Sequence, residues 1–178
     1  MAGTPAPEVI QPADMLGRLV AFNTVSAHSN ILLIDSVADY LSGHGIEAQT
    51  QVSADGAKAD LIATIGPAEP GGVILSGHTD VVPVEGQDWQ GDPFTMTARD
   101  ERLYGRGTAD MKGFIAVALA LVPEFLSLGL RRPLHLVLSY DEEVGCLGAP
   151  GLIKRFQRDF PDASAAIIGE PTNMKLAN

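Results

Sequence analysis

Apolar and polar residues alternate along this chain with two different periods. Apolar spacings of three and four residues predict amphipathic helices, over 13–22, 30–42, 114–128 and 148–160. Short apolar or alternating runs bounded by Gly, Pro or Asp predict strands, at 46–52, 60–65, 73–77, 134–139 and 163–168. Strands and helices that follow one another in this way predict an α/β fold with a largely parallel or mixed sheet and flanking helices.

Two stretches stand outside this alternation. The Pro-rich residues before 13 predict a mobile start. Residues 85–102 are mostly polar, so we expect a long loop with a short hairpin there, and loops of this length in compact domains tend to be functional. The strand at 73–77 is by contrast an aliphatic run, which predicts burial on both faces of the sheet.

This aliphatic strand leads directly into His78 and Asp80. Residues two apart in an extended chain point to the same side, so the imidazole and the carboxylate are delivered together. Such a pair is typical of a metal ligand with its orienting partner, or of a catalytic acid and base. A histidine at the edge of the core, satisfied by a nearby aspartate, explains the pattern equally well at this point.

More carboxylates follow the later strands. Glu142 and Glu143 come shortly after the fourth predicted strand, and Glu170 follows the fifth. The carboxyl ends of parallel strands share one edge of a sheet, where α/β proteins bind their ligands, so these groups are expected near the imidazole. Asp110, at the start of the third predicted helix, can reach the same edge or can act as a helix N-cap.

One imidazole among several carboxylates favours divalent metal ions. The donor set suits zinc, cobalt or manganese, and the surplus of carboxylates favours two ions over one, because without cations the carboxylates repel one another. The physical interpretation is a dinuclear metal-dependent hydrolase. The other histidines lack such neighbours: His28 and His44 are predicted at the surface or at helix ends, and His135 as a packed, hydrogen-bonded core residue.

Composition narrows the class of protein further. The chain has 178 residues, 46% hydrophobic and 19% charged, enough for one well-buried core. Its formal net charge of −10 argues against nucleic-acid and anionic-membrane partners, because no basic stripe is present to release counterions. The single cysteine, Cys146, excludes an intrachain disulfide and a cysteine-rich zinc cluster. Without a signal-peptide pattern or a membrane-spanning apolar run, a cytoplasmic location is expected.

Four stretches in order resemble the M20 family of metallopeptidases and aminoacylases, and within it the acetylornithine deacetylase subgroup. They are SGHTDVVPV at 76–84, LYGRGTADMKGF at 103–114, SYDEEVGCLG at 139–148 and IGEPT at 168–172. They span most of the chain, and four specific motifs in this order make chance similarity a poor explanation. The resemblance implies a zinc-aminopeptidase-like catalytic domain.

The resemblance also implies a role for each candidate residue. It implies two divalent ions, zinc or cobalt, with four protein ligands: His78, Asp110, Glu143 and Glu170. Asp110 is implied to bridge both ions, and the peptide bond after it to be cis. Asp80 is implied to hydrogen-bond the His78 imidazole. The ligand set therefore includes three of the strand-end groups and the aspartate before the third helix.

The implied reaction is hydrolysis of a small N-acyl amino acid. Glu142 is the implied general base, which takes a proton from the attacking water and delivers it to the leaving amine. In the deacetylase subgroup the substrate is N2-acetyl-L-ornithine, and the products are acetate and ornithine, a step in arginine biosynthesis. The motifs fix this chemistry better than the acyl group. A succinyl-diaminopimelate desuccinylase, an aminoacylase or a dipeptidase stays open, as does a non-catalytic truncated paralogue that binds metal.

One feature of the family has no counterpart in the sequence. The family binds its second ion with a histidine near the end of a considerably longer chain, beyond an inserted lid and dimerisation domain, whereas only eight residues follow Glu170 here and none is a histidine. We therefore expect residues 1–178 to be the N-terminal part of the catalytic domain, without the lid domain and the C-terminal segment. We expect weak or single metal occupancy and little activity from this chain alone, and a homodimer in the full-length protein.

Overall fold

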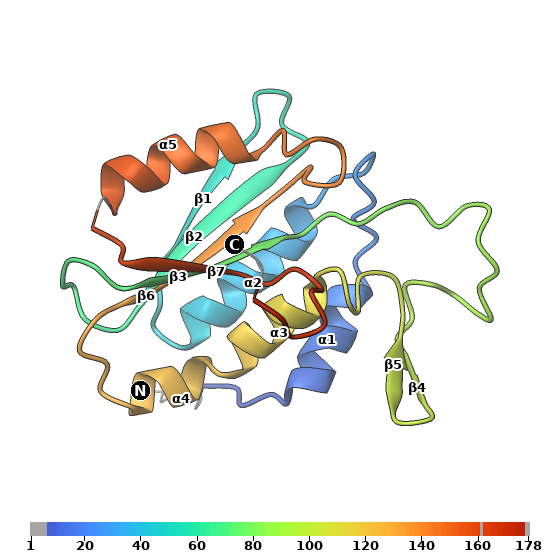
Figure 1. Cartoon of the computed structure of the whole chain (residues 1–178), viewed down its shortest axis with the longest axis horizontal. Coiled ribbons are helices and arrows are strands. Elements are labelled where there is room, and N and C mark those ends of the chain that lie inside the picture. Colours follow the sequence, from blue (N-terminus) through green and yellow to red (C-terminus); the bar gives the residue numbers. More distant parts are fainter. Residues whose placement is uncertain (1–6, 161, 177–178) are drawn as a thin grey trace, which may run out of the picture.

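A five-stranded sheet lies at the centre of the part of the chain that the structure describes, residues 7–160 and 162–176 (Figure 1). In this computed structural model the strand order is β1-β2-β6-β3-β7. The strands are β1 (Ala48–Val52), β2 (Ala59–Ile65), β3 (Val73–His78), β6 (Leu134–Ser139) and β7 (Ala165–Ile168). β1 and β6 pair antiparallel with β2, whereas β6 and β7 pair in parallel with β3. The predicted mixed α/β fold is confirmed; the predicted mobile start falls partly on residues 1–6, which lie outside the described residues.

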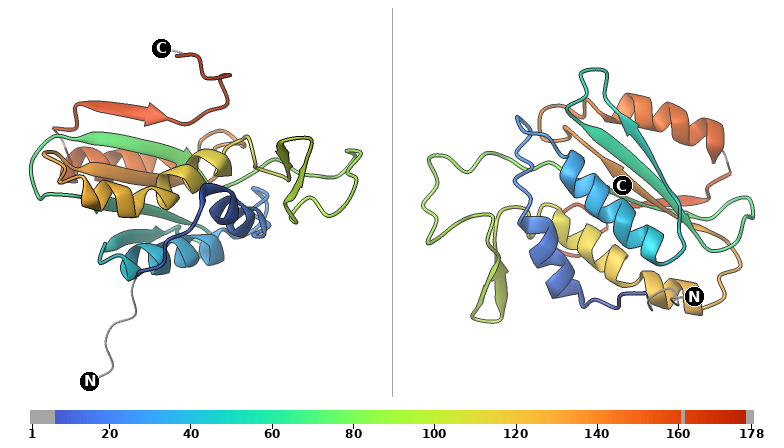
Figure 2. Two further views of the ribbon diagram at one scale, coloured as in Figure 1. Left: turned by 90° about the horizontal axis from the view of Figure 1, so that it is seen from below. Right: turned by 180° about the vertical axis from the view of Figure 1, so that it is seen from behind.

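Helices cover the two faces of the sheet unequally. One face carries four helices, α1 (Pro12–Val20), α2 (Ile31–Gly43), α3 (Lys112–Ala120) and α4 (Val122–Ser127), and the other carries α5 (Ala149–Asp159) (Figures 1 and 2). Successive strand residues point to opposite faces and so enter two cores. Leu61 and Leu138 pack with the four helices, whereas Ile62 and Val137 pack against Leu152 of α5. No helix in the described ranges is long and apolar enough to cross a membrane.

Two sequence-based expectations about these elements are wrong. The helix predicted over 114–128 is two helices, α3 and α4, which meet at Leu121. Pro123 lies in the first turn of α4, where its missing N–H is tolerated, and it cannot continue α3. The strand at 73–77 is not buried on both faces: residues 73–76 are half-buried, and the neighbouring strand β7 is exposed.

The long loop between β3 and α3 projects from the sheet and carries the predicted hairpin. β4 (Thr97–Arg99) and β5 (Arg102–Tyr104) pair antiparallel around a turn at Asp100 and Glu101 (Figure 1). Both turn residues have positive φ, a conformation that aspartate tolerates better than most side chains. The hairpin lies away from the sheet edge where the candidate site residues meet.

Candidate metal centre

Three neighbouring parallel strands bring their carboxyl ends to one edge of the sheet. β3 ends at His78, which lies opposite Ser139, the last residue of β6. The segment leaving β6 carries Glu142 and Glu143, and β7 ends two residues before Glu170. Residues that follow separate strands in the sequence therefore meet at this edge, as expected where parallel strands end together.

His78 lies at the centre of this group. Its Nε2 atom is 3.1 Å from Oδ1 of Asp110, 3.8 Å from Oε1 of Glu170 and 3.9 Å from Oε2 of Glu142. One ligand atom each from His78, Asp110 and Glu170 lies within 4.8 Å of the others. The imidazole is buried, whereas the three carboxylate side chains are 37–47% exposed. A cation bound among them can therefore be reached by a substrate from solvent.

Asp110 reaches the imidazole from the segment before α3. The N-cap alternative is wrong, because α3 begins at Lys112, its N-cap residue is Met111 and no side chain caps it. The peptide bond after Asp110 is cis, as the resemblance implied. The buried side chain of Lys112 anchors this segment to the end of α1, since its Nζ donates to the carbonyl oxygens of Leu19 at 3.0 Å and Phe22 at 2.8 Å.

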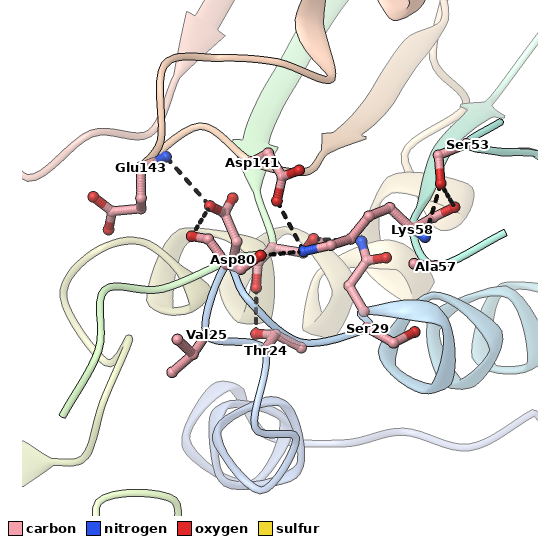
Figure 3. Close-up of polar contacts among 12 residues, drawn as sticks. Thr24, Val25, Ser29, Ser53, Ala57, Lys58, Asp80, Asp141 and Glu143 are labelled. Atoms are coloured by element: carbon pink, nitrogen blue, oxygen red, sulfur yellow. Dashed lines mark hydrogen bonds and ion pairs between the residues drawn. The ribbon is translucent and has the colours of Figure 1, made fainter. Parts of the chain in front are cut away.

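Asp80 links the imidazole to the loop that carries the glutamates, and Figure 3 shows its contact with Glu143 in that loop. Nδ1 of His78 lies 2.9 Å from the backbone carbonyl of Asp80, which only accepts, so Nδ1 donates there, while Nε2 faces the carboxylate of Asp110. The Asp80 carboxylate lies 3.5 Å from the same nitrogen. It accepts hydrogen bonds from Ser26 Oγ at 2.6 Å and from the backbone N–H groups of Glu142 and Glu143 at 3.1 and 3.2 Å. The short contact to the imidazole thus comes from the carbonyl, and the carboxylate orders the loop.

The electrostatics of this pair follow from burial opposed by nearby charge. Burial alone disfavours the imidazolium, but hydrogen bonds and attraction to Asp80 outweigh it and raise the pKa of His78 to about 9. Burial also raises the pKa of Asp80, but the nearby His78 imidazole and hydrogen bonds from Ser26 and the backbone N–H of Glu142 outweigh it and lower that pKa to about 2. The pair is charged at neutral pH, so a metal ion must displace the proton on the imidazole.

Burial and nearby negative charge raise the pKa values of two glutamates at the site. Burial, followed by repulsion from Asp110, raises the pKa of Glu143. Burial raises the pKa of Glu170 as well, and repulsion from Asp110 and Glu142 adds to this against the attraction of His78. A divalent cation removes such repulsion, and one imidazole nitrogen with carboxylate oxygens is a donor set that zinc, cobalt and manganese accept. The residues present therefore fit a metal ion.

Three residues at the site were missed by reasoning from the sequence. Ser26 donates to Asp80, Lys58 forms an ion pair with Asp141 at 2.8 Å, and Sγ of Cys146 lies 3.6 Å from a Glu142 carboxylate oxygen. Ser26 and Lys58 lie far from the motifs in sequence. The one signal in the sequence was weak: Lys58 is a charged residue directly before the buried strand β2.

The other histidines lie where the sequence predicted. His28 is exposed and contacts the side chain of Asn23, and His44 is the C-cap residue of α2. His135 is buried, with its ring nitrogens 3.0 Å from Thr64 Oγ1 and 3.2 Å from the carbonyl oxygen of Gly71. His78 is therefore the histidine that meets the carboxylates within the described residues.

Known proteins share both the motifs and a large part of the chain. Residues 74–178 match the sequence profile of peptidase family M20/M25/M40. The chain is 40% identical over 170 residues to an acetylornithine deacetylase of Pasteurella multocida (strain Pm70), an alignment that covers 91% of this chain and 43% of that protein. It is 39% identical to one of Photorhabdus laumondii, covering 90% and 43%. The chain thus spans less than half the length of these relatives.

Solved structures share the fold. Human carnosine dipeptidase 1 superposes on this chain with a TM-score of 0.77 and 24% sequence identity, and the match covers 88% of this chain and 38% of the dipeptidase chain. The M20 family metallo-carboxypeptidase Sso-CP2 of Sulfolobus solfataricus has a TM-score of 0.72 at 23% identity, over 90% and 37%. The profile match covers more than half of the chain and includes His78, Asp110 and the three glutamates of the site. The chain belongs to peptidase family M20/M25/M40.

Proposed function

We propose that this chain carries the metal-binding part of an amidohydrolase that removes the acetyl group from N2-acetyl-L-ornithine, giving ornithine and acetate. The observation that carries the proposal is the convergence of three carboxylates on one imidazole: oxygens of Asp110, Glu142 and Glu170 lie within 3.9 Å of His78 Nε2. The choice of acyl group is supported by relatives of about 40% identity that bear the name acetylornithine deacetylase.

In this proposal the strand-end groups hold the metal. His78, Asp110 and Glu170 would hold one divalent ion, zinc or cobalt, and Asp110 and Glu143 would contribute to holding a second. When bound, such ions polarise the amide carbonyl and lower the pKa of water. The carbonyl of Asp80 keeps the proton of His78 on Nδ1, which leaves Nε2 available as a ligand.

Glu142 is the proposed general base. Its carboxylate lies 3.9 Å from Nε2 of His78 and keeps 39% of its side-chain surface exposed, so it faces both the metal ligands and the space a substrate enters. One carboxylate oxygen takes the proton of the attacking water and delivers it to the leaving amine nitrogen. Asp80 fixes the backbone N–H of Glu142 and so the direction from which the carboxylate approaches.

We also propose that residues 1–178 form the N-terminal part of the catalytic domain. The relatives named above are more than twice as long as the region they share with this chain. Full activity and a complete second metal site then need a region equivalent to the rest of those relatives. Adding such a region to this chain is expected to raise turnover, and full turnover by the 178-residue chain would contradict this part of the proposal.

The substrate is tested with a panel of amides. The full-length protein, loaded with Zn2+, is assayed on N2-acetyl-L-ornithine, N-succinyl-diaminopimelate, other N-acetyl amino acids and dipeptides. Acetylornithine is expected to give the highest kcat/KM, and removing the metal with a chelator is expected to abolish turnover until Zn2+ or Co2+ is restored. A clear preference for the succinyl substrate or for dipeptides would contradict the acyl assignment while leaving the metal-dependent hydrolysis in place.

A further inference from the structure

Lys58 connects two of the segments that meet at the site. It lies directly before β2, and its side chain is 10% exposed. Its Nζ donates to the backbone carbonyl of Ser26 at 2.6 Å and pairs with Oδ1 of Asp141 at 2.8 Å. Asp141 immediately precedes Glu142. Lys58 therefore holds Asp141, the residue directly before Glu142 and Glu143.

These contacts close a ring with the carboxylate of Asp80 (Figure 3). Ser26 Oγ donates to Asp80 at 2.6 Å, and the backbone N–H of Glu142 donates to the same carboxylate at 3.1 Å. Asp141 and Glu142 are joined by a peptide bond, and Ser26 contributes both its hydroxyl and its carbonyl. Every hydrogen bond in the ring involves a charged group, which makes each stronger than a neutral one.

The ring holds the glutamate loop, the segment of Asp141, Glu142 and Glu143, from two sides. Asp80 accepts hydrogen bonds from the backbone N–H groups of Glu142 and Glu143, and Lys58 pairs with the side chain of Asp141. Asp141 has φ of 55°, in the left-handed region. Without the ammonium, its largely buried carboxylate is left unpaired, and the loop can pivot on the Asp80 hydrogen bonds.

We propose that Lys58 is a positioning residue for the hydrolytic site. By fixing the Asp141 carboxylate and the Ser26 carbonyl, it keeps Glu142 and Glu143 beside the imidazole. The inference rests on the proposed function, which assigns those glutamates to the reaction and to the metal. Lys58 acts through Asp141 and does not touch the reacting atoms.

A second buried ion pair offers a matched control. Nη1 of Arg155 in α5 lies 2.7 Å from Oδ1 of Asp60 in β2, and the two side chains are 10% and 6% exposed. Arg155 also donates to the side chain of Gln51 and the carbonyl of Gln49 in β1. Removing either cation leaves a buried carboxylate unpaired and destabilises the fold. The partners of Lys58 lead to the loop that carries Glu142 and Glu143, whereas those of Arg155 lead to β1 and β2.

The test compares Lys58→Met with Arg155→Met in the intact protein, because methionine keeps length and removes charge. Thermal midpoint, Zn2+ affinity by chelator competition, and kcat and KM on N2-acetyl-L-ornithine are measured for each variant. Both substitutions are expected to lower the midpoint. Lys58→Met alone is expected to lower Zn2+ affinity and kcat, each about 10- to 100-fold, the range for losing an outer partner of metal ligands, with KM unchanged.

Equal losses of Zn2+ affinity and kcat in the two variants would overturn the inference, as would unchanged values in Lys58→Met. If Lys58→Met does not fold, Asp141→Asn keeps an acceptor and removes the charge; it is expected to lower kcat by a smaller factor, and an unchanged kcat overturns the inference. If the wild type binds Zn2+ but hydrolyses no N-acyl amino acid, the proposed function fails. The Zn2+ affinities of Lys58→Met and Arg155→Met then still decide the positioning role.

Discussion

Two buried histidines in neighbouring strands have opposite surroundings. His78 ends β3 and His135 lies near the start of β6, and each is 2% exposed. The ring of His135 packs 4.5 Å from that of Phe160, and its nitrogens face the Thr64 hydroxyl and the Gly71 carbonyl. The ring of His78 faces carboxylates on both of its nitrogens. Equal burial therefore accompanies an uncharged environment in one case and an acidic one in the other.

The two imidazoles differ in pKa for the same reason. Burial disfavours the charged form of both. At His135 burial prevails over the hydrogen bond to Gly71 and lowers the pKa. At His78 burial is outweighed by Asp80, and the pKa is raised to about 9. Position at the carboxyl end of a parallel strand, where other strand ends deliver acid, distinguishes the candidate site from a core histidine.

The largest expected effect belongs to Glu142, the carboxylate beside His78 that is proposed as the general base and not as a metal ligand. Glu142→Ala is expected to lower kcat by about 10²- to 10⁴-fold, the contribution of a general base, while Zn2+ content stays unchanged. Activity assays and metal analysis of the purified variant measure both. Glu124→Ala, at an exposed position in α4, is the control and should match the wild type. Hydrolysis by Glu142→Ala at the wild-type rate would show that another group is the base.

One substitution at each histidine tests whether His78 binds metal and His135 does not. His78→Gln is expected to lower Zn2+ affinity by more than about 100-fold, because losing a ligand costs at least as much as losing a ligand's partner. His135→Gln is expected to leave Zn2+ affinity unchanged, since its nitrogens face Thr64 and Gly71. Calorimetric titration with Zn2+ measures both. Comparable losses at the two positions would remove the distinction between them.

A substitution at a partner of His78 should lower activity, whereas one at a partner of His135 should lower stability alone. Asp80→Asn removes the charge beside His78 and replaces one of the two carboxylate oxygens that accept from the backbone N–H groups of Glu142 and Glu143, so activity is expected to fall about 10- to 100-fold. Thr64→Val removes the hydroxyl beside His135 and is expected to cost about 1 kcal/mol of unfolding free energy with activity unchanged. Kinetics and urea unfolding separate the two effects. An Asp80→Asn protein as active as the wild type would deny Asp80 its positioning role.

The smallest expected effect is a pH dependence of stability at His135. Its pKa is lowered in the folded protein, so below about pH 6.5 the unfolded chain binds more protons than the folded one. The free energy of unfolding is therefore expected to fall as the pH falls below that value. His135→Gln should show a shallower decline in urea unfolding between about pH 7 and pH 5. A steeper decline in the variant would contradict the lowered pKa.

Local patterns predicted most of the fold. The helices and strands were found because apolar spacing reports local structure, but their contacts depend on partners elsewhere in the chain. In α5 the aliphatic side chain of Ile153 is 53% exposed, whereas the cationic side chain of Arg155 turns inward to pair with Asp60. The break between α3 and α4 was missed, although Pro123 was a visible signal.

The site was predictable where its residues follow strands and hidden where they act through distant contacts. His78 and the glutamates come directly after apolar runs, which is a local signal. Ser26 and Lys58 reach the site through hydrogen bonds to partners 54 and 83 residues away in sequence. Such contacts depend on the register of strands and loops, which periodicity does not encode. The split of tasks between the two adjacent glutamates came from the family resemblance and remains a prediction.

The central claim is that the groups around His78, unlike those around His135, hold a divalent cation. A crystal structure of the Zn2+-loaded protein, with anomalous scattering recorded at the zinc edge, tests it most directly. A strong anomalous peak is expected between Nε2 of His78 and the carboxylates of Asp110 and Glu170, the atoms that lie within 4.8 Å of one another. No peak at that position, or a strong peak only at another histidine, would contradict the account.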